Sequence, residues 1–388
     1  MKIRGRVLVL AVSMTLVAFA VIGGFMSKAI ARQESYQYLR TFEDVVSLIL
    51  NNYVEEVNID KVMHGAMHGL ADGLDPDSAY LDAGQVKVFE KGDLGGPGQT
   101  GIELTRQYYL RVIAARDGSP AAKAGLMPGD YIRAIDGQST RDTSVYEGQR
   151  LLRGKPGTKV HLTVLRGNAA EPHEIDLVRE ELPALAVRSR IAAPGVGYLR
   201  IAEFGKGTID QIKSEVSSVT KAGAKNLVVD LRGTAFGDAD TGFAAARLFV
   251  KTGTLGFRQD RGKDKEAIAS AAGDGSIALP VMLLTDNGTS NAAETFAAAL
   301  WGNKRATLIG ERTLGRAARQ RLVRLPDGSA LMLTHLLYLA PGGGAIHEKG
   351  LTPDVAVEQP DVDFGQPAPP KDATLDKAIE QLTQKAAA

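Results

Sequence analysis

Residues 279–320 constrain the fold of this chain more than any other stretch of its sequence. The apolar run at residues 281–284 predicts a buried strand, residues 286–288 (Asp-Asn-Gly) predict a tight turn, and the alanine-rich residues 292–300 predict a helix. A second strand is expected at residues 306–309, followed by a glycine-bounded loop. A strand that turns sharply into a helix can hold a nucleophile beside backbone N–H donors and the positive end of the helix dipole. The segment is therefore typical of the active-site region of an α/β enzyme.

Residues 279–320 also resemble the active-site region of the carboxyl-terminal processing peptidases, also called tail-specific proteases. That family carries roughly N-x-G-[TS]-A-S-A-S-E and then G-E-x-T-x-G-K-G-x-x-Q, in which the first Ser of S-A-S-E is the nucleophile and the Lys of G-K-G is the general base. The matching positions in register are Gly288, Thr289, Glu294, Gly310, Glu311, Thr313, Gly315 and Gln320. The resemblance implies a serine-peptidase fold.

The two positions that carry the family's chemistry are substituted in this chain. The nucleophile position falls on Asn291 and the base position on Arg316, with the interval between them unchanged. Asn has no comparable nucleophile, and Arg keeps its proton in proteins, so it cannot act as the base. Loss of both members of a catalytic unit is expected to lower the rate on the order of 10⁶-fold. The sequence predicts an inactive homologue with a relic cleft formed by Asn291, Arg316, Glu294 and Gln320.

A third departure lies in residues 227–237, where the family has a strand that ends in D-L-R-x-N-x-G-G. The glycine-rich turn of this pattern helps to form the family's oxyanion hole. Thr234 replaces the Asn and Phe236 replaces the first Gly of the pair, whereas Gly237 is retained. Because a bulky residue does not readily adopt positive φ, Phe236 is expected to distort or plug the hole if the turn requires positive φ there.

An active enzyme is the alternative hypothesis, with Ser290 as its fallback nucleophile. Neighbouring residues at a helix start point about 100° apart, so Ser290 should not aim where Asn291 aims. Capping of the helix is its expected role. The chain has no Cys, which excludes a thiol protease, disulfides and Cys-ligated metal sites.

The charge balance and the histidines set further limits on function. The 46 Lys and Arg residues against 45 Asp and Glu give a net charge of +1, which provides no footprint for nucleic acid. His64 and His68 are four residues apart, as metal ligands on one helix face would be, but no third ligand is evident. We therefore predict neither a metal site nor a cofactor.

Residues 1–31 predict export of the protein. Three basic residues precede residues 7–26, which carry no charge and are long enough to span a bilayer. Residues 29–31 (Ala-Ile-Ala) resemble a signal-peptide cleavage site, but the apolar run is longer than the usual signal core. We expect an uncleaved membrane anchor, with a secreted protein after signal cleavage as the alternative. Both place the body on the extracytoplasmic side, in the periplasm or outside the cell.

Residues 94–184 resemble a PDZ domain, with its signature at residues 119–137. Such a domain adds a peptide strand to a sheet edge while loop N–H groups hold the terminal carboxylate of the peptide. Packing within the chain is the alternative role of this module. The predicted peptide-binding residues are Gly101, Ile102, Glu103 and Leu104.

The predicted architecture is a multidomain α/β (mixed α+β) chain. We expect an extracytoplasmic peptidase homologue that binds unfolded or C-terminal peptides of exported proteins through its PDZ domain and cleft. The alternative is an active serine-type endopeptidase that cleaves near protein C-termini. An oligomer or an active paralogue would be a further partner. The expected segments are 1–31 (anchor or signal), 32–93 (helical), 94–184 (PDZ), 185–358 (peptidase-like α/β core) and 359–388 (linker and C-terminal helix).

Overall fold

The computed structural model describes residues 36–167, 171–360, 362–366 and 370–387. The chain divides into two compact units, Met1–Met67 and His68–Ala388. The first unit contains a helix over residues 36–52 and most of helix α2 (Ile59–Asp72). Among the described residues, no helix combines the length and the apolar character needed to cross a membrane. The predicted anchor at residues 7–26 lies outside the described residues.

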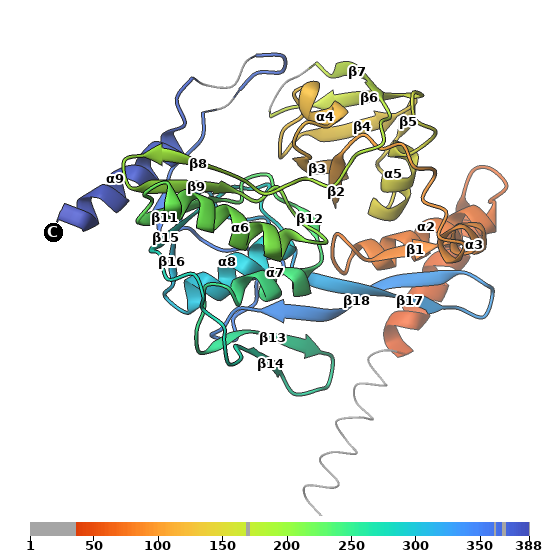
Figure 1. The fold of residues 1–388 in the computed structure, drawn as a ribbon. Helices are drawn as coiled ribbons and strands as arrows, with labels where there is room; N and C mark the ends of the chain where they lie inside the picture. Colours follow the sequence, from red (N-terminus) through yellow and green to blue (C-terminus); the bar gives the residue numbers. More distant parts are fainter. Residues whose placement is uncertain (1–35, 168–170, 361, 367–369, 388) are drawn as a thin grey trace, which may run out of the picture. The chain divides into compact units, whose positions relative to one another are not determined.

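The core of the second unit is a six-stranded sheet in the order β19-β16-β15-β11-β9-β8 (Figure 1). All its neighbouring pairs are parallel except β8 with β9. The strands are β8 (Arg188–Ala193), β9 (Val196–Arg200), β11 (Asn226–Asp230), β15 (Val281–Thr285), β16 (Ala306–Gly310) and β19 (Val355–Ala356).

Helices cover both faces of this sheet, which explains the continuous apolar run of β15. Leu283 packs in the core cluster that includes the helices of one face, whereas Met282 packs in the cluster that includes α9 on the other face. Alternate residues of a strand point to opposite faces, so a strand covered on both sides is apolar throughout. The helices are α6 (Thr208–Lys221), α7 (Ala239–Ala246), α8 (Ala292–Gly302) and α9 (Ala373–Ala387).

Because β11, β15 and β16 are parallel, the segments that follow them lie at the same end of the sheet, beyond the carboxyl ends of the strands. These segments hold the residues predicted as oxyanion turn, nucleophile position and base position, respectively. Ligand sites of open α/β sheets lie outside the carboxyl ends of the strands. The fold therefore places the segments that hold Phe236, Asn291 and Arg316 beyond the carboxyl ends of neighbouring strands.

A second, largely antiparallel sheet has the order β1-β18-β13-β14, with β17 paired to β18. Strand β1 lies within residues 32–93, which were predicted to be helical. It is a strand because its residues pair with β18, with Ala79 opposite Met332 and Leu81 opposite Ala330. A separate two-stranded parallel ladder joins β10 (Glu203–Phe204) to β12 (Phe236–Gly237). The strands of the second sheet are β1 (Ala79–Leu81), β13 (Thr254–Asp260), β14 (Glu266–Ala269), β17 (Ala318–Arg324) and β18 (Ala330–Leu339).

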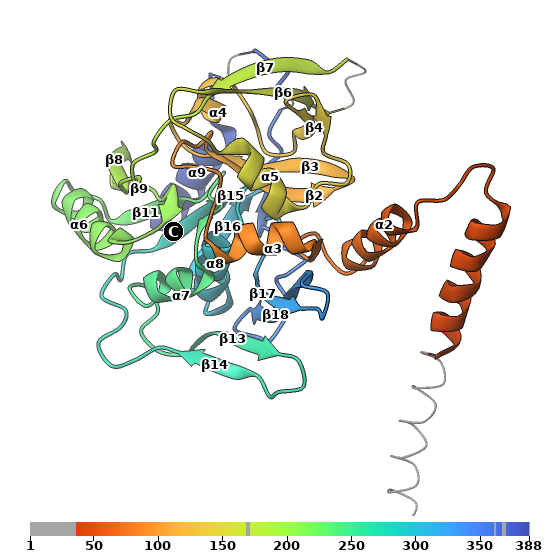
Figure 2. The same ribbon diagram turned by 90° about the vertical axis from the view of Figure 1, so that its right-hand side faces the viewer.

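The PDZ-like region forms a sheet in the order β2-β3-β4-β6-β7, with β5 paired to β4. Strand β2 is at the edge, and helix α5 lies beside it (Figure 2). The approach of α5 is close, since a Cβ atom at Gly148 would lie 2.3 Å from Leu110 Cδ1. The elements are β2 (Ile102–Gln107), β3 (Tyr109–Ala115), β4 (Tyr131–Ile135), β5 (Gln138–Ser139), β6 (Lys159–Leu165), β7 (His173–Val178), α4 (Pro120–Lys123) and α5 (Val145–Leu152).

The segment predicted as a linker after residue 358 contacts the PDZ-like sheet. The ring of Phe364 stacks on His173 with centroids 4.5 Å apart, and the Arg166 guanidinium lies 4.8 Å from the same ring. The Pro- and Asp-rich composition predicted a linker, and one aromatic side chain is enough to dock such a segment on the PDZ-like sheet. The predicted boundaries of the five segments stay predictions.

Candidate functional site

Asn291 lies at the start of α8, in the turn that follows β15. Its backbone has φ 54° and ψ −115°, and a non-glycine residue with positive φ at such a site carries strain of about 1–3 kcal/mol. The Asn291 N–H donates to the Arg316 carbonyl oxygen at 3.0 Å and to the Glu294 carboxylate at 3.3 Å. The strained strand-to-helix turn of a nucleophile is thus present, although the side chain that it displays is not a nucleophile.

The side chain of Asn291 is held by the turn predicted to form the oxyanion hole. Its Nδ2 donates to the Gly237 carbonyl oxygen at 2.6 Å. An oxyanion hole needs N–H donors aimed at the reacting atom. Here the turn presents a carbonyl oxygen to position 291, and the negative end of that dipole would repel a developing oxyanion.

Phe236 does not strain this turn. Positive φ falls on Gly237, at 122°, where a Cβ atom would lie 2.4 Å from the Phe204 carbonyl oxygen. Phe236 instead lies in β12 and packs, like Leu314, against the buried cluster of Ile113, Ala114 and Ala235. The requirement for positive φ that we considered at Phe236 is therefore met by the glycine beside it.

Glu294 ties the segment after β16 to the start of α8. The side chain is fully buried, and its Oε1 accepts hydrogen bonds from the Thr313 hydroxyl and from the Gly315 N–H at 2.7 Å. Its Oε2 accepts from the N–H groups of Arg316 at 2.7 Å and Asn291 at 3.3 Å. Burial raises the pKa of this carboxyl to about 7, although the four donors act to lower it.

The guanidinium of Arg316 pairs with two carboxylates that are distant in sequence. Its Nε donates to Asp77 at 3.1 Å, and its Nη1 donates to Glu103 Oε1 at 2.7 Å. The same Nη1 also donates to the Leu104 carbonyl oxygen at 3.3 Å. The side chain of Arg316 therefore links the segment after β16 to the turn before β1 and to the edge strand β2.

Asn291, Arg316 and Glu294 hydrogen-bond to one another through the backbone of Asn291 and Arg316 and the carboxylate of Glu294, and not through the side chain of Arg316. Only the backbone of Arg316 contacts the other two residues. A long side chain adopts the direction of its strongest charge partners, and the carboxylates of Asp77 and Glu103 attract a guanidinium more strongly than a neutral amide does.

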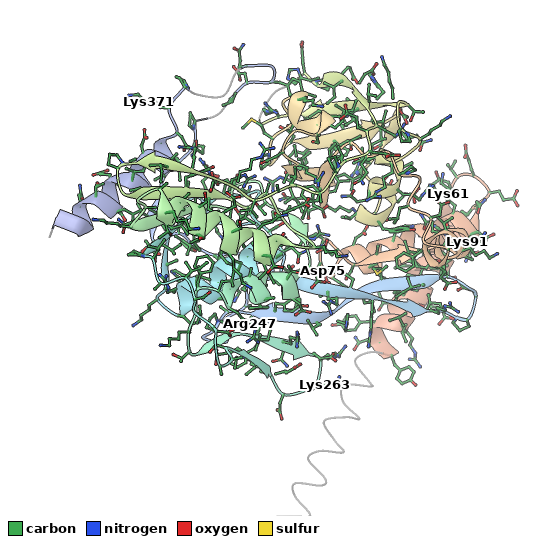
Figure 3. The ribbon with its side chains drawn as sticks, in the orientation of Figure 1. Lys61, Asp75, Lys91, Arg247, Lys263 and Lys371 are labelled. Atoms are coloured by element: carbon green, nitrogen blue, oxygen red, sulfur yellow. The ribbon has the colours of Figure 1, made fainter. Side chains whose placement is uncertain are left out.

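The turn before β1 places Asp77 for this contact. The Asp75 carboxylate, labelled in Figure 3, accepts the N–H of Asp77 at 2.9 Å and the N–H of Ser78 at 2.8 Å. Asp77 stands where the family pattern G-L-D-P-H-S-x-Y-L has His, and only 9% of it is exposed. Two substitutions, to Asp at this position and to Arg at position 316, thus create one ion pair. Their opposite charges were the signal in the sequence that could have predicted it.

Electrostatics exclude Arg316 as a base. Burial acts to lower the pKa of its guanidinium, but the charges and hydrogen bonds of Asp77 and Glu103 outweigh burial and raise that pKa. Burial also raises the pKa of Glu103, an effect that Arg316 offsets only in part. A group whose proton is held this firmly cannot accept another from a hydroxyl.

The groove cavity, with a volume of about 340 Å³, lies between α5 and this ion pair. Gln320 also lines it and donates from Nε2 to the Thr334 hydroxyl at 3.1 Å. Of the four relic-cleft residues, Arg316 and Gln320 line this cavity together with the PDZ-like edge, whereas Asn291 and Glu294 do not line it. Residues that line it include Asp77, Glu103, Val145, Gln149, Arg316 and Gln320.

Of the four residues predicted to bind peptide, only Glu103 lines this cavity. Gly101, Ile102 and Leu104 are buried. Two carbonyl groups of β2 already accept side-chain donors, Ile102 from Gln149 Nε2 at 3.2 Å and Leu104 from Arg316. A peptide that adds to this edge has to displace these side chains, and peptide binding by the four residues stays a prediction.

Ser290 is 1% exposed, and its hydroxyl has no hydrogen-bond partner in the described part of the chain. Its expected capping role is therefore wrong. The backbone explains the difference, because the Ser290 N–H is directed to the Thr234 carbonyl oxygen at 3.0 Å, which turns the side chain into the core. A fallback nucleophile at this position has neither a base nor access to a substrate in this conformation.

Comparison with known families agrees with this arrangement. Residues 195–357 match peptidase family S41, residues 111–166 match a PDZ domain, and residues 23–85 match the N-terminal domain of the activating protease CtpB. The fold and the segments around the site thus have the architecture of the PDZ-containing peptidases of family S41.

Relatives of known sequence narrow the assignment. The chain is 31% identical over 360 residues to a carboxy-terminal-processing protease of Bartonella bacilliformis, covering 89% of this chain and 83% of the relative. It is 33% identical over 304 residues to a carboxyl-terminal-processing protease of a Synechocystis species, covering 77% and 71%. The solved photosystem II D1 C-terminal processing protease superimposes with a TM-score of 0.69 at 27% identity, covering 79% of this chain and 84% of that one.

The chain belongs to the carboxy-terminal processing proteases of peptidase family S41. The resemblance first drawn from residues 279–320 is confirmed, and so is the mixed α/β fold class with its PDZ domain and peptidase core.

Proposed function

We propose that this chain is a catalytically inactive carboxy-terminal processing protease homologue that binds extended or C-terminal peptides of exported proteins. The observation that carries the proposal is the pairing of Arg316 with Asp77 and Glu103. The two carboxylates hold a cationic guanidinium at the position of the family's general base. The pairing also brings Arg316 of the relic cleft and Glu103 of the PDZ edge strand together in the lining of the groove cavity.

Three features argue against hydrolysis. Position 291 carries an amide, position 316 carries a guanidinium that keeps its proton, and Gly237 turns its carbonyl oxygen toward the place of the nucleophile. An active serine-type endopeptidase that uses Ser290 is the alternative. It finds no support in the geometry, since that hydroxyl is buried without a partner in the described residues.

Peptide binding is supported by the open edge of β2. Helix α5 and β2 border the groove cavity, which is the arrangement in which PDZ domains add a peptide strand. The side chains of Gln149 and Arg316 cap carbonyl groups at this edge, so a bound peptide replaces hydrogen bonds that the free protein already makes. This exchange favours modest affinity.

We expect carboxylate-ended peptides to bind the full-length chain with roughly micromolar Kd, about −8 kcal/mol. Amidation of the peptide C-terminus should weaken binding by at least about 1.5 kcal/mol, because a charge-assisted hydrogen bond is lost. Calorimetric titration of a peptide library in both forms measures the difference. Equal affinity of the two forms would reject carboxylate capture.

A matched pair of variants locates the binding. Val145→Trp fills the groove cavity beside α5 and should weaken binding at least about tenfold, since overpacking removes the space for a peptide side chain. Val178→Trp makes the same change on β7, at the opposite edge of the PDZ-like sheet, and should leave affinity unchanged. Equal affinities in the two variants would place peptide binding elsewhere on the chain.

We further propose that residues 7–26 anchor the protein in a membrane with its body on the extracytoplasmic side. The uncharged run and the basic residues before it support this proposal. Membrane fractionation should recover the protein with the bilayer after a high-pH wash, and the mass of its N-terminal peptide should show no cleavage near residue 31. Recovery of a shortened chain in the soluble fraction would instead establish signal cleavage.

A further inference from the structure

A second cavity, of about 290 Å³, shares Asp77 and Arg316 with the groove cavity but is otherwise lined by different residues. We call it the His347 cavity. It is bordered by the outer half of β2, by the segment after β16 and by the segment before β19. Its further lining includes Thr105, Gln107, Arg111, His347 and Glu348.

The imidazole of His347 has unmet hydrogen-bonding capacity. The residue is 8% exposed, and neither ring nitrogen has a hydrogen-bond partner in the described part of the chain. A buried polar group left in this way destabilises the folded state, so native structures rarely contain one without a reason. A half-turn about the Cβ–Cγ bond exchanges nitrogen and carbon positions of the ring without moving the backbone.

A cation without a carboxylate partner lines the same cavity. Arg106 forms an ion pair with Asp72, and Arg316 forms ion pairs with Asp77 and Glu103. Arg111, in contrast, forms no ion pair with any described residue. Its hydrogen bonds are long, to the Gly129 carbonyl oxygen at 3.4 Å and to Gln107 Oε1 at 3.5 Å, and its guanidinium carbon lies 5.7 Å from the centroid of the Tyr131 ring.

We propose that the His347 cavity binds a carboxylate group. One carboxylate oxygen accepts from the His347 imidazole, and the other accepts from the Arg111 guanidinium, whose planar donors suit such a group. The described residues contain no cluster of three His, Asp or Glu side chains able to hold a metal, which removes the main competing use of a histidine. Glu348 is exposed on the lining and repels a second negative charge, so a monocarboxylate is preferred.

This site goes beyond the proposed peptide groove, because it requires neither the open edge of β2 nor Val145. A carboxylate could come from a small organic acid or from the C-terminus of a peptide. The first probe is acetate, titrated into the full-length chain with isotope-labelled histidine. The ring signals of His347, assigned by their loss in His347→Gln, should shift in a saturable manner.

The variants separate binding from general salt effects. His347→Gln and Arg111→Gln should each weaken acetate binding about tenfold or more, as expected when one charge-assisted hydrogen bond is lost. His161→Gln removes an imidazole from an exposed position of β6 and should have no effect. If His347→Gln does not fold, Arg111→Gln alone decides, because Arg111 is only partly buried.

The source of the carboxylate follows from a comparison of ligands. The first ligand is an acetylated dipeptide with a free carboxylate. If it binds more tightly than acetate and its amide does not bind, the natural carboxylate is a peptide C-terminus. Equal affinity of acetate and the dipeptide acid indicates a small organic acid. Absence of a saturable shift up to about 0.1 M acetate, or unchanged binding in Arg111→Gln, would overturn the proposal.

Discussion

The double variant Asn291→Ser with Arg316→Lys is expected to remain without measurable peptide hydrolysis. A lysine at position 316 would lie within reach of Asp77 and Glu103, whose negative charges stabilise its protonated form and raise its pKa. Such a lysine cannot take the proton of a serine hydroxyl at pH 7. Restoring the nucleophile and base therefore also requires Asp77→His and Glu103→Gln.

The quadruple variant should hydrolyse peptides measurably faster than the unchanged chain. The gain should be a part of the rate enhancement on the order of 10⁶-fold that a complete catalytic unit provides. Cleavage of an unfolded exported protein, followed by electrophoresis, measures this gain. Adding Phe236→Gly to the double variant should bring none, because the positive φ of the turn already falls on Gly237. Strong activity of the double variant alone would show that the two carboxylates do not control position 316.

The unchanged chain provides the corresponding control. If it cleaves the same substrate and the cleavage disappears in Ser290→Ala, the protein is an active enzyme and the proposed inactivity is wrong. This outcome would require Ser290 to leave its buried position, since its hydroxyl contacts no base in the described residues.

Stability that depends on Glu294 should decrease as the pH rises. Burial raises the pKa of its carboxyl to about 7 in the folded protein, from an ordinary value of 4.5. The folded state therefore binds the proton more tightly than the unfolded state does. The resulting stabilisation is fully present below about pH 4.5 and is lost as the pH rises through about 7, an effect of about 3 kcal/mol.

Urea denaturation between about pH 4.5 and 8 measures this dependence. Glu294→Gln cannot ionise, so its unfolding free energy should lack the decrease that the unchanged chain shows in this range. Glu358→Gln removes an exposed carboxyl and should retain the decrease. Parallel curves for the unchanged chain and Glu294→Gln would mean that the four donors keep Glu294 ionised throughout.

Local patterns were sufficient to predict the framework of the site. The apolar run of β15 and the alanine-rich run of α8 predicted a strand–turn–helix unit, because a strand covered on both faces and a buried helix leave clear signatures in composition. The tight turn at Gly237 and the PDZ domain could likewise be predicted, because glycine and the other residues of these motifs favour particular backbone conformations. The short strand β1 could not be predicted in this way, since it exists only through its pairing with β18.

The sequence by itself therefore determined the family, the mixed α/β fold and the loss of both catalytic side chains, because residue identity is enough to exclude nucleophile and base chemistry. Only the tertiary structure decided where the replacement side chains point. Arg316 turns to Asp77 and Glu103, which lie more than 200 positions away along the chain. The direction of a long charged side chain depends on partners that the fold brings together, and no local pattern encodes that proximity. The unpartnered imidazole of His347 became visible for the same reason, since burial and missing hydrogen bonds are properties of the folded chain.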